Sequence, residues 1–144
     1  MHKVYQCIQA VDVFGLDHEG IYRISGNQTQ VQELKSLFDH SSSTVDFRNP
    51  ESFYHDVNNA AHLLKLFFRE LQDPLFTNEH YAELIEAAKI GDDTVRRDSL
   101  HAIINALPDP NYATLRALTL HLHRVEEHRE QNRMTSSTLA VIFA

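Results

Sequence analysis

Three of the four glycines in this chain fall within one short stretch, Gly15–Gly26, with the sequence GLDHEGIYRISG. Glycine serves where the backbone needs a positive φ or a close approach, so the clustering predicts a tightly bent connector. Arg23 lies inside this connector among apolar neighbours. Such a cation is either tied down by a nearby carboxylate, for which Glu19 is the candidate, or directed at an anion elsewhere.

The same stretch approaches the pattern of a phosphate-binding loop without completing it. Gly15 and Gly20 have the glycine spacing of G-x-x-x-x-G-K-[ST], but Ile21 and Tyr22 follow where the motif needs Lys and Ser or Thr. Without that lysine and hydroxyl, nothing holds the terminal phosphates or Mg²⁺. The sequence therefore predicts that the chain does not bind nucleotide by itself.

Length and charge limit the remaining classes of protein. A chain of 144 residues predicts one domain, residues 1–144, with a core of its own. The net charge of −7 argues against binding to nucleic acid or to anionic membranes, which requires a basic surface. No apolar run is long enough to insert into a membrane. The single cysteine, Cys7, is expected to be a buried thiol and fits a reducing, cytoplasmic setting.

Apolar residues recur at helical spacing in seven segments, and no long alternating stretch occurs. This pattern predicts an all-α fold, a single helical bundle. We also expect the chain to be truncated at its C-terminus, because it stops within an apolar segment. The expected helices cover approximately residues 3–13, 27–39, 57–71, 78–88, 93–107, 111–128 and 139–143.

The helix expected at 57–71 carries a polar stripe opposite its apolar face. His62, Lys65 and Arg69 fall at i, i+3 and i+7, so two cations stack on one side. A stacked pair of like charges is unfavourable by about 0.2–0.5 kcal/mol in an isolated helix. The stripe is either a solvated basic surface or a pair reserved for an external acidic partner.

Ten histidines raise the question of a metal site. His121 and His123 project about 200° apart on a helix, and no H-E-x-x-H motif occurs. No cysteine or carboxylate repeats with His121 and His128. We therefore expect no metal, and we expect surface or core-edge histidines, which leaves a metal-dependent hydrolase as a distant alternative.

Three blocks of sequence together resemble the signature of the RhoGAP domain, in the right order and over essentially the whole chain. They are Glu19–Gly26 (EGIYRISG), Leu64–Leu75 (LKLFFRELQDPL), and Asn132–Thr135 (NRMT) with Leu139–Phe143 (LAVIF). The resemblance implies an all-helical bundle. It also implies that the family domain continues past Phe143, so that its C-terminal helices are missing here.

The resemblance further implies a GTPase-activating domain for a Rho-family small GTPase of the Rho, Rac or Cdc42 type. Arg23 would be the arginine finger, while Lys65 and Arg69 would contact the GTPase and help to seat the loop. Thr138 stands where the family usually has Asn, and it would be a further contact. The domain would need no cofactor, since GTP and Mg²⁺ belong to the partner, and it would be no enzyme itself. Recruitment to a membrane would fall to other domains of a longer protein. The alternative is a catalytically silent scaffold that binds a GTPase.

Overall fold

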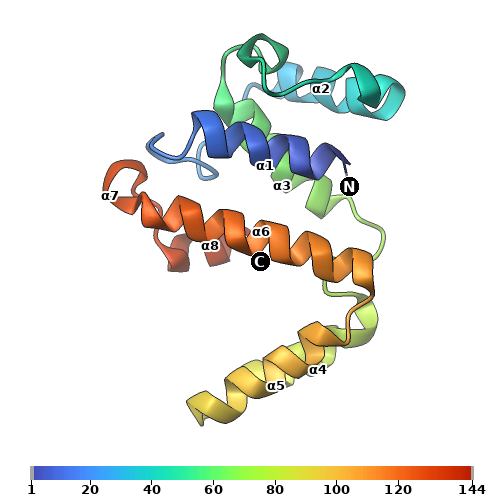
Figure 1. The fold of residues 1–144 in the computed structure, drawn as a ribbon, viewed down its shortest axis with the longest axis vertical. Helices are drawn as coiled ribbons and strands as arrows, with labels where there is room; N and C mark the ends of the chain where they lie inside the picture. Colours follow the sequence, from blue (N-terminus) through green and yellow to red (C-terminus); the bar gives the residue numbers. More distant parts are fainter. Residues whose placement is uncertain (1, 144) are drawn as a thin grey trace. The chain divides into compact units, whose positions relative to one another are not determined.

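The computed structural model describes residues 2–143, which form eight α-helices and two short 3₁₀-helices (Figure 1). No strand occurs among these residues, so the predicted all-α class is confirmed. None of the described helices is long and apolar enough to cross a membrane. The chain divides into two compact units, which we call the first unit (residues 1–69 and 118–144) and the second unit (residues 70–117).

The first unit contains both ends of the chain and most of its helices. The last part of α6 (Asp109–Glu127) also belongs to it, because this helix passes from one unit into the other. Its remaining elements are α1 (His2–Phe14), α2 (Gln28–Ser41), η1 (Ser42–Thr44), η2 (Pro50–Phe53), α3 (Val57–Arg69), α7 (Arg129–Asn132) and α8 (Ser136–Phe143).

The core of the first unit forms where α1 packs along α3 (Figure 1). Both helices bury the apolar residues that recur at helical spacing, and Cys7 on α1 is fully buried, as predicted. Aromatic rings then join α2 and the following loop to α3. Phe38 meets both Phe47 and Phe67, with ring centroids 5.4 and 5.7 Å apart. Phe47 is completely buried and anchors the polar loop after α2.

The second unit consists of α4 (Asn78–Ala88), α5 (Asp93–Asn105) and the first part of α6. A side chain caps the N-terminus of both α4 and α5. Thr77 Oγ1 accepts from the amide of His80, and Asp92 Oδ1 accepts from the amide of Val95. α5 contains no buried residue. The apolar residues that recur at helical spacing along α5 are therefore only partly covered.

Two local expectations were wrong. Residues 129–132 form the short helix α7, although no helix was expected between residues 128 and 139, and the helix ends at Arg133 in the left-handed conformation. α6 begins at Asp109, whereas Pro110 was expected to precede the helix. Proline is tolerated in a first helical turn because the amide it lacks would have no partner there.

Gly26 offers a direct test of how closely the glycine-bracketed loop (residues 15–26) approaches α3. A Cβ at this position would lie 2.6 Å from Asn59 Oδ1, 2.9 Å from its Cα and 3.0 Å from the carbonyl oxygen of Asn58. Helix backbone cannot move aside, so Gly26→Ala should lower the free energy of unfolding by about 1–3 kcal/mol. Urea unfolding followed by circular dichroism measures this.

The matched control is Gly91→Ala, because a Cβ at Gly91 would meet nothing within 4 Å. This variant should stay within about 0.5 kcal/mol of the wild type. Equal stability of the two variants would mean that the loop is not pressed against α3 in solution.

Candidate functional site

Arg23 lies exposed on the glycine-bracketed loop. Within residues 2–143 its side chain makes no ion pair or hydrogen bond, and the alternative of a structural pair with Glu19 is therefore not realised. Its backbone amide, by contrast, donates to the carbonyl oxygen of Gly20 at 2.9 Å. The guanidinium of Arg23 is therefore free to reach a group outside the molecule, while the backbone of Arg23 is fixed by its hydrogen bond to Gly20.

The loop reaches this shape through two residues in the left-handed region. Gly20 has φ +79°, where glycine carries no steric penalty. Tyr22 has φ 72°, which is uncommon for a bulky residue and persists only when surrounding contacts enforce it. Tyr22 is completely buried, so the chain turns one side chain into the core and presents the next, Arg23, to solvent.

Three side chains of helix α3 form hydrogen bonds with backbone groups on one side of this loop and of Asn27, the residue that follows it. The amide of Gly26 donates to His62 Nδ1 at 3.1 Å, and the amide of Asn27 donates to Asn59 Oδ1 at 2.9 Å. Lys65 Nζ donates to the carbonyl oxygen of Tyr22 at 2.5 Å. These side chains lie on one face of α3, and each satisfies a backbone group of the loop or of Asn27.

The position of Lys65 changes the interpretation of the polar stripe on α3. Lys65 is only 8% exposed, and burial followed by the charge of Arg69 lowers the pKa of its amine. Neither alternative given for the stripe, a solvated surface or a pair reserved for an external partner, describes Lys65, because periodicity gives a direction around the helix and not what covers it. Arg69, in contrast, is exposed, and its side chain has no partner within residues 2–143.

The C-terminal part of the chain holds the other side of the loop. The amide of Gly20 donates to the carbonyl oxygen of Asn132 at 2.9 Å, and the ring of Phe143 meets that of Tyr22 edge-on at 5.1 Å. Asn132 is fully buried, and its side-chain amide donates to the carbonyl oxygens of Leu16 and Val125. All three sequence blocks therefore meet at one loop.

Thr138 lies on α8 and is partly exposed. Its hydroxyl is 3.1 Å from that of Thr135, whose oxygen also accepts from the amide of Thr138 at 3.2 Å. Thr135 is thus the residue that caps the start of α8. The contribution of Thr138 to a contact with a partner stays a prediction.

Sequence reasoning missed a buried polar group beneath the loop. His121 is 0% exposed, so the expectation of surface or core-edge histidines was wrong for this residue. Its two ring nitrogens contact Tyr22 and Asp12, and Asp12 also pairs with Arg124. One signal was present: His121 lies three residues after Leu118 and four before Val125, on the apolar face of α6.

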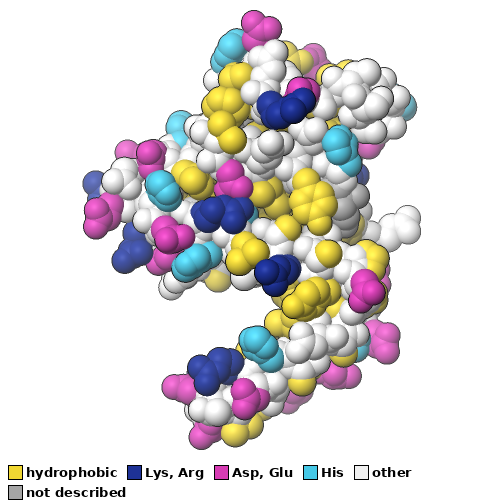
Figure 2. Space-filling model, in the orientation of Figure 1, with side chains coloured by type: hydrophobic (Ala, Val, Ile, Leu, Met, Phe, Trp, Pro, Cys, Tyr) yellow, Lys and Arg dark blue, Asp and Glu magenta, His cyan; other side chains and the backbone are white. Residues whose placement is uncertain are grey.

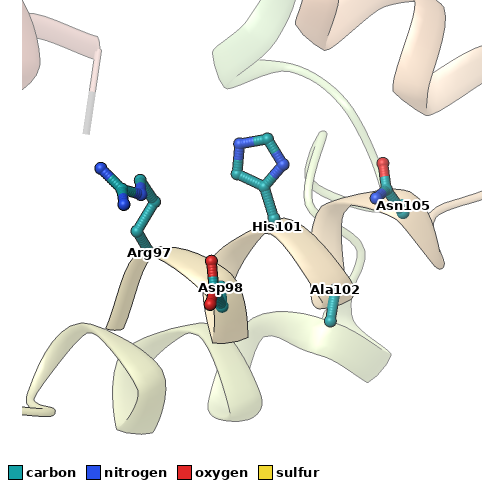
Figure 3. Close-up of a pocket in the computed structure, with 5 residues that line it drawn as sticks. All are labelled: Arg97, Asp98, His101, Ala102 and Asn105. Atoms are coloured by element: carbon teal, nitrogen blue, oxygen red, sulfur yellow. The ribbon is translucent and has the colours of Figure 1, made fainter. Parts of the chain in front are cut away.

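The second unit carries one hollow that offers no enclosed site for a small molecule. A hollow of about 390 Å³ lies on α5, but all of its lining residues belong to that helix and are exposed. Arg97 and His101 point away from α4 there rather than toward an enclosed space (Figure 3). Within residues 2–143, no group of three or more potential metal ligands occurs.

The distribution of surface charge favours a contact with a partner through a few cations over binding through a broad basic surface. On the face drawn in Figure 2, Lys and Arg side chains lie in small separate groups with acidic side chains among them. A broad basic surface, as used for nucleic acid, is not present on this face.

Comparison with known proteins identifies the family. The sequence profile of the RhoGAP domain matches residues 2–144. The chain is 44% identical over 140 residues to human Rho GTPase-activating protein 27, and 41% identical over 140 residues to the probable Rho-GTPase-activating protein 7 of Schizosaccharomyces pombe. Each alignment covers 97% of this chain, but only 15% and 20% of those proteins, respectively.

Solved structures agree with this assignment. The crystal structure of human Rho GTPase activating protein 15 superposes with a TM-score of 0.91 at 33% identity, covering 98% of this chain and 65% of that one. The BH domain from GRAF, the GTPase regulator associated with focal adhesion kinase, gives 0.87 at 29% identity, covering 98% and 74%. The chain belongs to the RhoGAP domain family.

The hydrogen bond from the amide of Gly26 to His62 depends on pH. Burial, followed by the charges of Lys65 and Arg69, lowers the pKa of His62 below 6.5, and the neutral Nδ1 accepts from Gly26. The stabilisation is therefore present above pH 6.5, decreases as pH falls through 6.5, and is lost below the folded-state pKa.

We expect the wild type to lose more stability than His62→Asn between about pH 7.5 and about pH 5, because Asn offers an acceptor that does not titrate. Urea unfolding across this range measures the difference. His123→Asn, at an exposed position on α6, is the control and should follow the wild type. Parallel curves for the wild type and His62→Asn would contradict the role of His62.

Proposed function

We propose that this chain is a GTPase-activating domain that stimulates GTP hydrolysis by a Rho-family small GTPase. In this proposal Arg23 enters the active site of the GTPase in trans. The observation that carries it is the exposed, unpaired guanidinium of Arg23 on a loop that α3, α6, α7 and α8 hold in place. The names of the relatives, Rho GTPase-activating proteins, support the same activity.

The chemistry of phosphoryl transfer accounts for the residue type. Negative charge spreads over the oxygens of the transferring phosphoryl group, and a guanidinium placed beside them neutralises it. An arginine supplied in this way accelerates hydrolysis by about 10³–10⁵-fold, or roughly 4–7 kcal/mol of barrier. GTP and Mg²⁺ belong to the partner, so the domain activates an enzyme and needs no cofactor of its own.

A fixed loop favours this task. A side chain carried on an ordered backbone loses less freedom when it enters the partner, so more of the interaction energy remains for the transition state. The planar fork of arginine also meets two phosphate oxygens at once, which the single ammonium of lysine cannot do.

The two cations of α3, Lys65 and Arg69, have different roles in this proposal. Lys65 is buried against Tyr22, which favours the role of seating the loop over that of a contact at the edge of an interface. Arg69 is exposed and unpaired within the described residues, which favours a direct contact with an acidic group of the GTPase. Thr138 would add one hydroxyl contact from α8.

The alternative is a scaffold that binds a GTPase without accelerating hydrolysis. The threonine at position 138, where the family usually has Asn, is the observation that favours it. The two functions differ in one measurement, because a scaffold binds the GTP-bound GTPase and leaves the hydrolysis rate unchanged.

Arg23→Ala should reduce the stimulated rate by about 10³-fold or more while leaving the affinity within about tenfold. The reason is that Arg23 interacts with charge that develops only in the transition state. Single-turnover hydrolysis against Rho, Rac and Cdc42 types, at saturating domain, measures the rate. Binding to the GTPase loaded with a non-hydrolysable GTP analogue measures the affinity.

The control is Arg97→Ala, which removes an exposed arginine from the second unit and should leave both quantities unchanged. Undiminished hydrolysis with Arg23→Ala would refute the finger. Tight binding without acceleration by the wild type would favour the scaffold.

Lys65→Met and Arg69→Ala should separate seating from contact. Lys65→Met removes the donor to Tyr22, so we expect a lower maximal rate at every salt concentration. Arg69→Ala should weaken binding at low salt, and the difference from the wild type should shrink as salt rises, since exposed charges are screened. Titrations of the hydrolysis rate between about 50 and about 300 mM NaCl measure both effects. Identical salt dependence in the two variants would contradict this division.

A further inference from the structure

A row of four polar side chains runs inward from the surface of the first unit to the glycine-bracketed loop. Arg124 Nη2 donates to Asp12 Oδ2 at 2.8 Å, and His121 Nδ1 lies 2.7 Å from Asp12 Oδ1. His121 Nε2 then lies 2.5 Å from the hydroxyl of Tyr22. The row connects α6, α1 and the loop, and it ends at the residue before Arg23.

The direction of each hydrogen bond follows from the groups involved. A carboxylate only accepts, so His121 Nδ1 donates to Asp12. Burial, followed by the nearby Cys7 and Asp12, raises the pKa of Tyr22 well above its usual value, so the phenol keeps its proton. An imidazole that carries its proton on Nδ1 has Nε2 as an acceptor for the Tyr22 hydroxyl, which satisfies both ring nitrogens.

Asp12 stays charged in this row. Burial opposes its ionisation, but hydrogen bonds from His121 and Arg124 outweigh this effect and lower the pKa of Asp12. The side chain of Asp12 is 25% exposed and that of Arg124 is 43% exposed, so the charged end of the row is near water. The imidazole and the phenol at the inner end are completely buried.

This arrangement is more specific than a core needs. Apolar side chains of the same volume stabilise a core as well as a buried polar row does, whereas hydrogen bonds fix the orientation of their members. The row acts on Tyr22, whose left-handed backbone places Arg23 outward. Three contacts constrain Tyr22: its hydroxyl meets His121, its carbonyl meets Lys65, and its ring packs on Phe143.

We propose that His121 is a positioning residue for Arg23: anchored by Asp12 and Arg124, it holds the phenol of Tyr22 and thereby the backbone that presents the arginine. This inference rests on the proposed function for its effect on hydrolysis. Its effect on the loop itself does not depend on a partner. His121 touches no reacting group and acts only through Tyr22.

The test uses Tyr22→Phe, which removes only the hydroxyl, and His121→Leu as a second variant. Tyr5→Phe and His123→Leu are the matched controls, since both positions are exposed and belong to α1 and α6. The first measurement is amide hydrogen exchange of the domain alone. The second is single-turnover hydrolysis, which gives the maximal stimulated rate and the domain concentration at half-maximal stimulation.

Tyr22→Phe should speed exchange of the Arg23 and Ile24 amides, which both donate to the carbonyl oxygen of Gly20, by about 3- to 10-fold. Exchange in the interior of α1 and α3 should change by less than about twofold. The maximal stimulated rate should fall by about 3- to 10-fold. The domain concentration at half-maximal stimulation should stay within about twofold of the wild-type value. The two control variants should match the wild type in both quantities. His121→Leu should reproduce this pattern.

Two results would overturn the proposal. One is unchanged exchange in the loop of Tyr22→Phe. The other is a uniform increase of exchange across the first unit with parallel losses in rate and affinity, which indicates a purely structural role. If the wild type accelerates hydrolysis by no GTPase of the panel, the proposed function fails, and the exchange pattern alone then decides the role of His121.

Discussion

The hydrogen bond from Lys65 Nζ to the carbonyl oxygen of Tyr22 is the interaction on which the presentation of Arg23 depends. A lysine that is 8% exposed is unfavourable unless an acceptor compensates for the water it has lost. The loop backbone supplies that acceptor, and in return it is held at its most strained residue. Helix and loop therefore stabilise each other, and neither the Lys65 ammonium nor the Tyr22 carbonyl oxygen has another hydrogen-bond partner within residues 2–143.

The loop connects two opposite requirements through adjacent residues. Tyr22 must be buried and oriented, whereas Arg23 must be free of internal partners. The left-handed turn at Tyr22 reconciles them, because it separates the directions of the two side chains. Contacts from α3, α6, α7 and α8 all act on the buried side, so the exposed arginine gains order without losing its availability.

The helices and the exposed arginine could be predicted from the sequence, whereas the support of the loop could not. Spacing of apolar residues locates helices well, and Asn27, Thr77 and Asp92 cap them as local chemistry requires. Spacing also placed Lys65 on a polar stripe, but it gives no information on which distant segment covers that stripe. The apolar face of α6 marked His121 as a candidate for burial, but its partners Asp12 and Tyr22 are remote in sequence, so no local pattern around α6 could identify them.

The hydrogen bond between Tyr22 and His121 joins residues that are 99 positions apart in the chain. Contacts of such long range form only after the intervening segments have been organised, since closing a long loop carries an entropic penalty. We therefore expect the arginine loop to be among the last parts of the first unit to reach its native shape during folding. In a partly folded chain that retains its helices but has not docked α6 and α7, the loop that carries Arg23 would be disordered. Arg23 would then be present without a fixed direction.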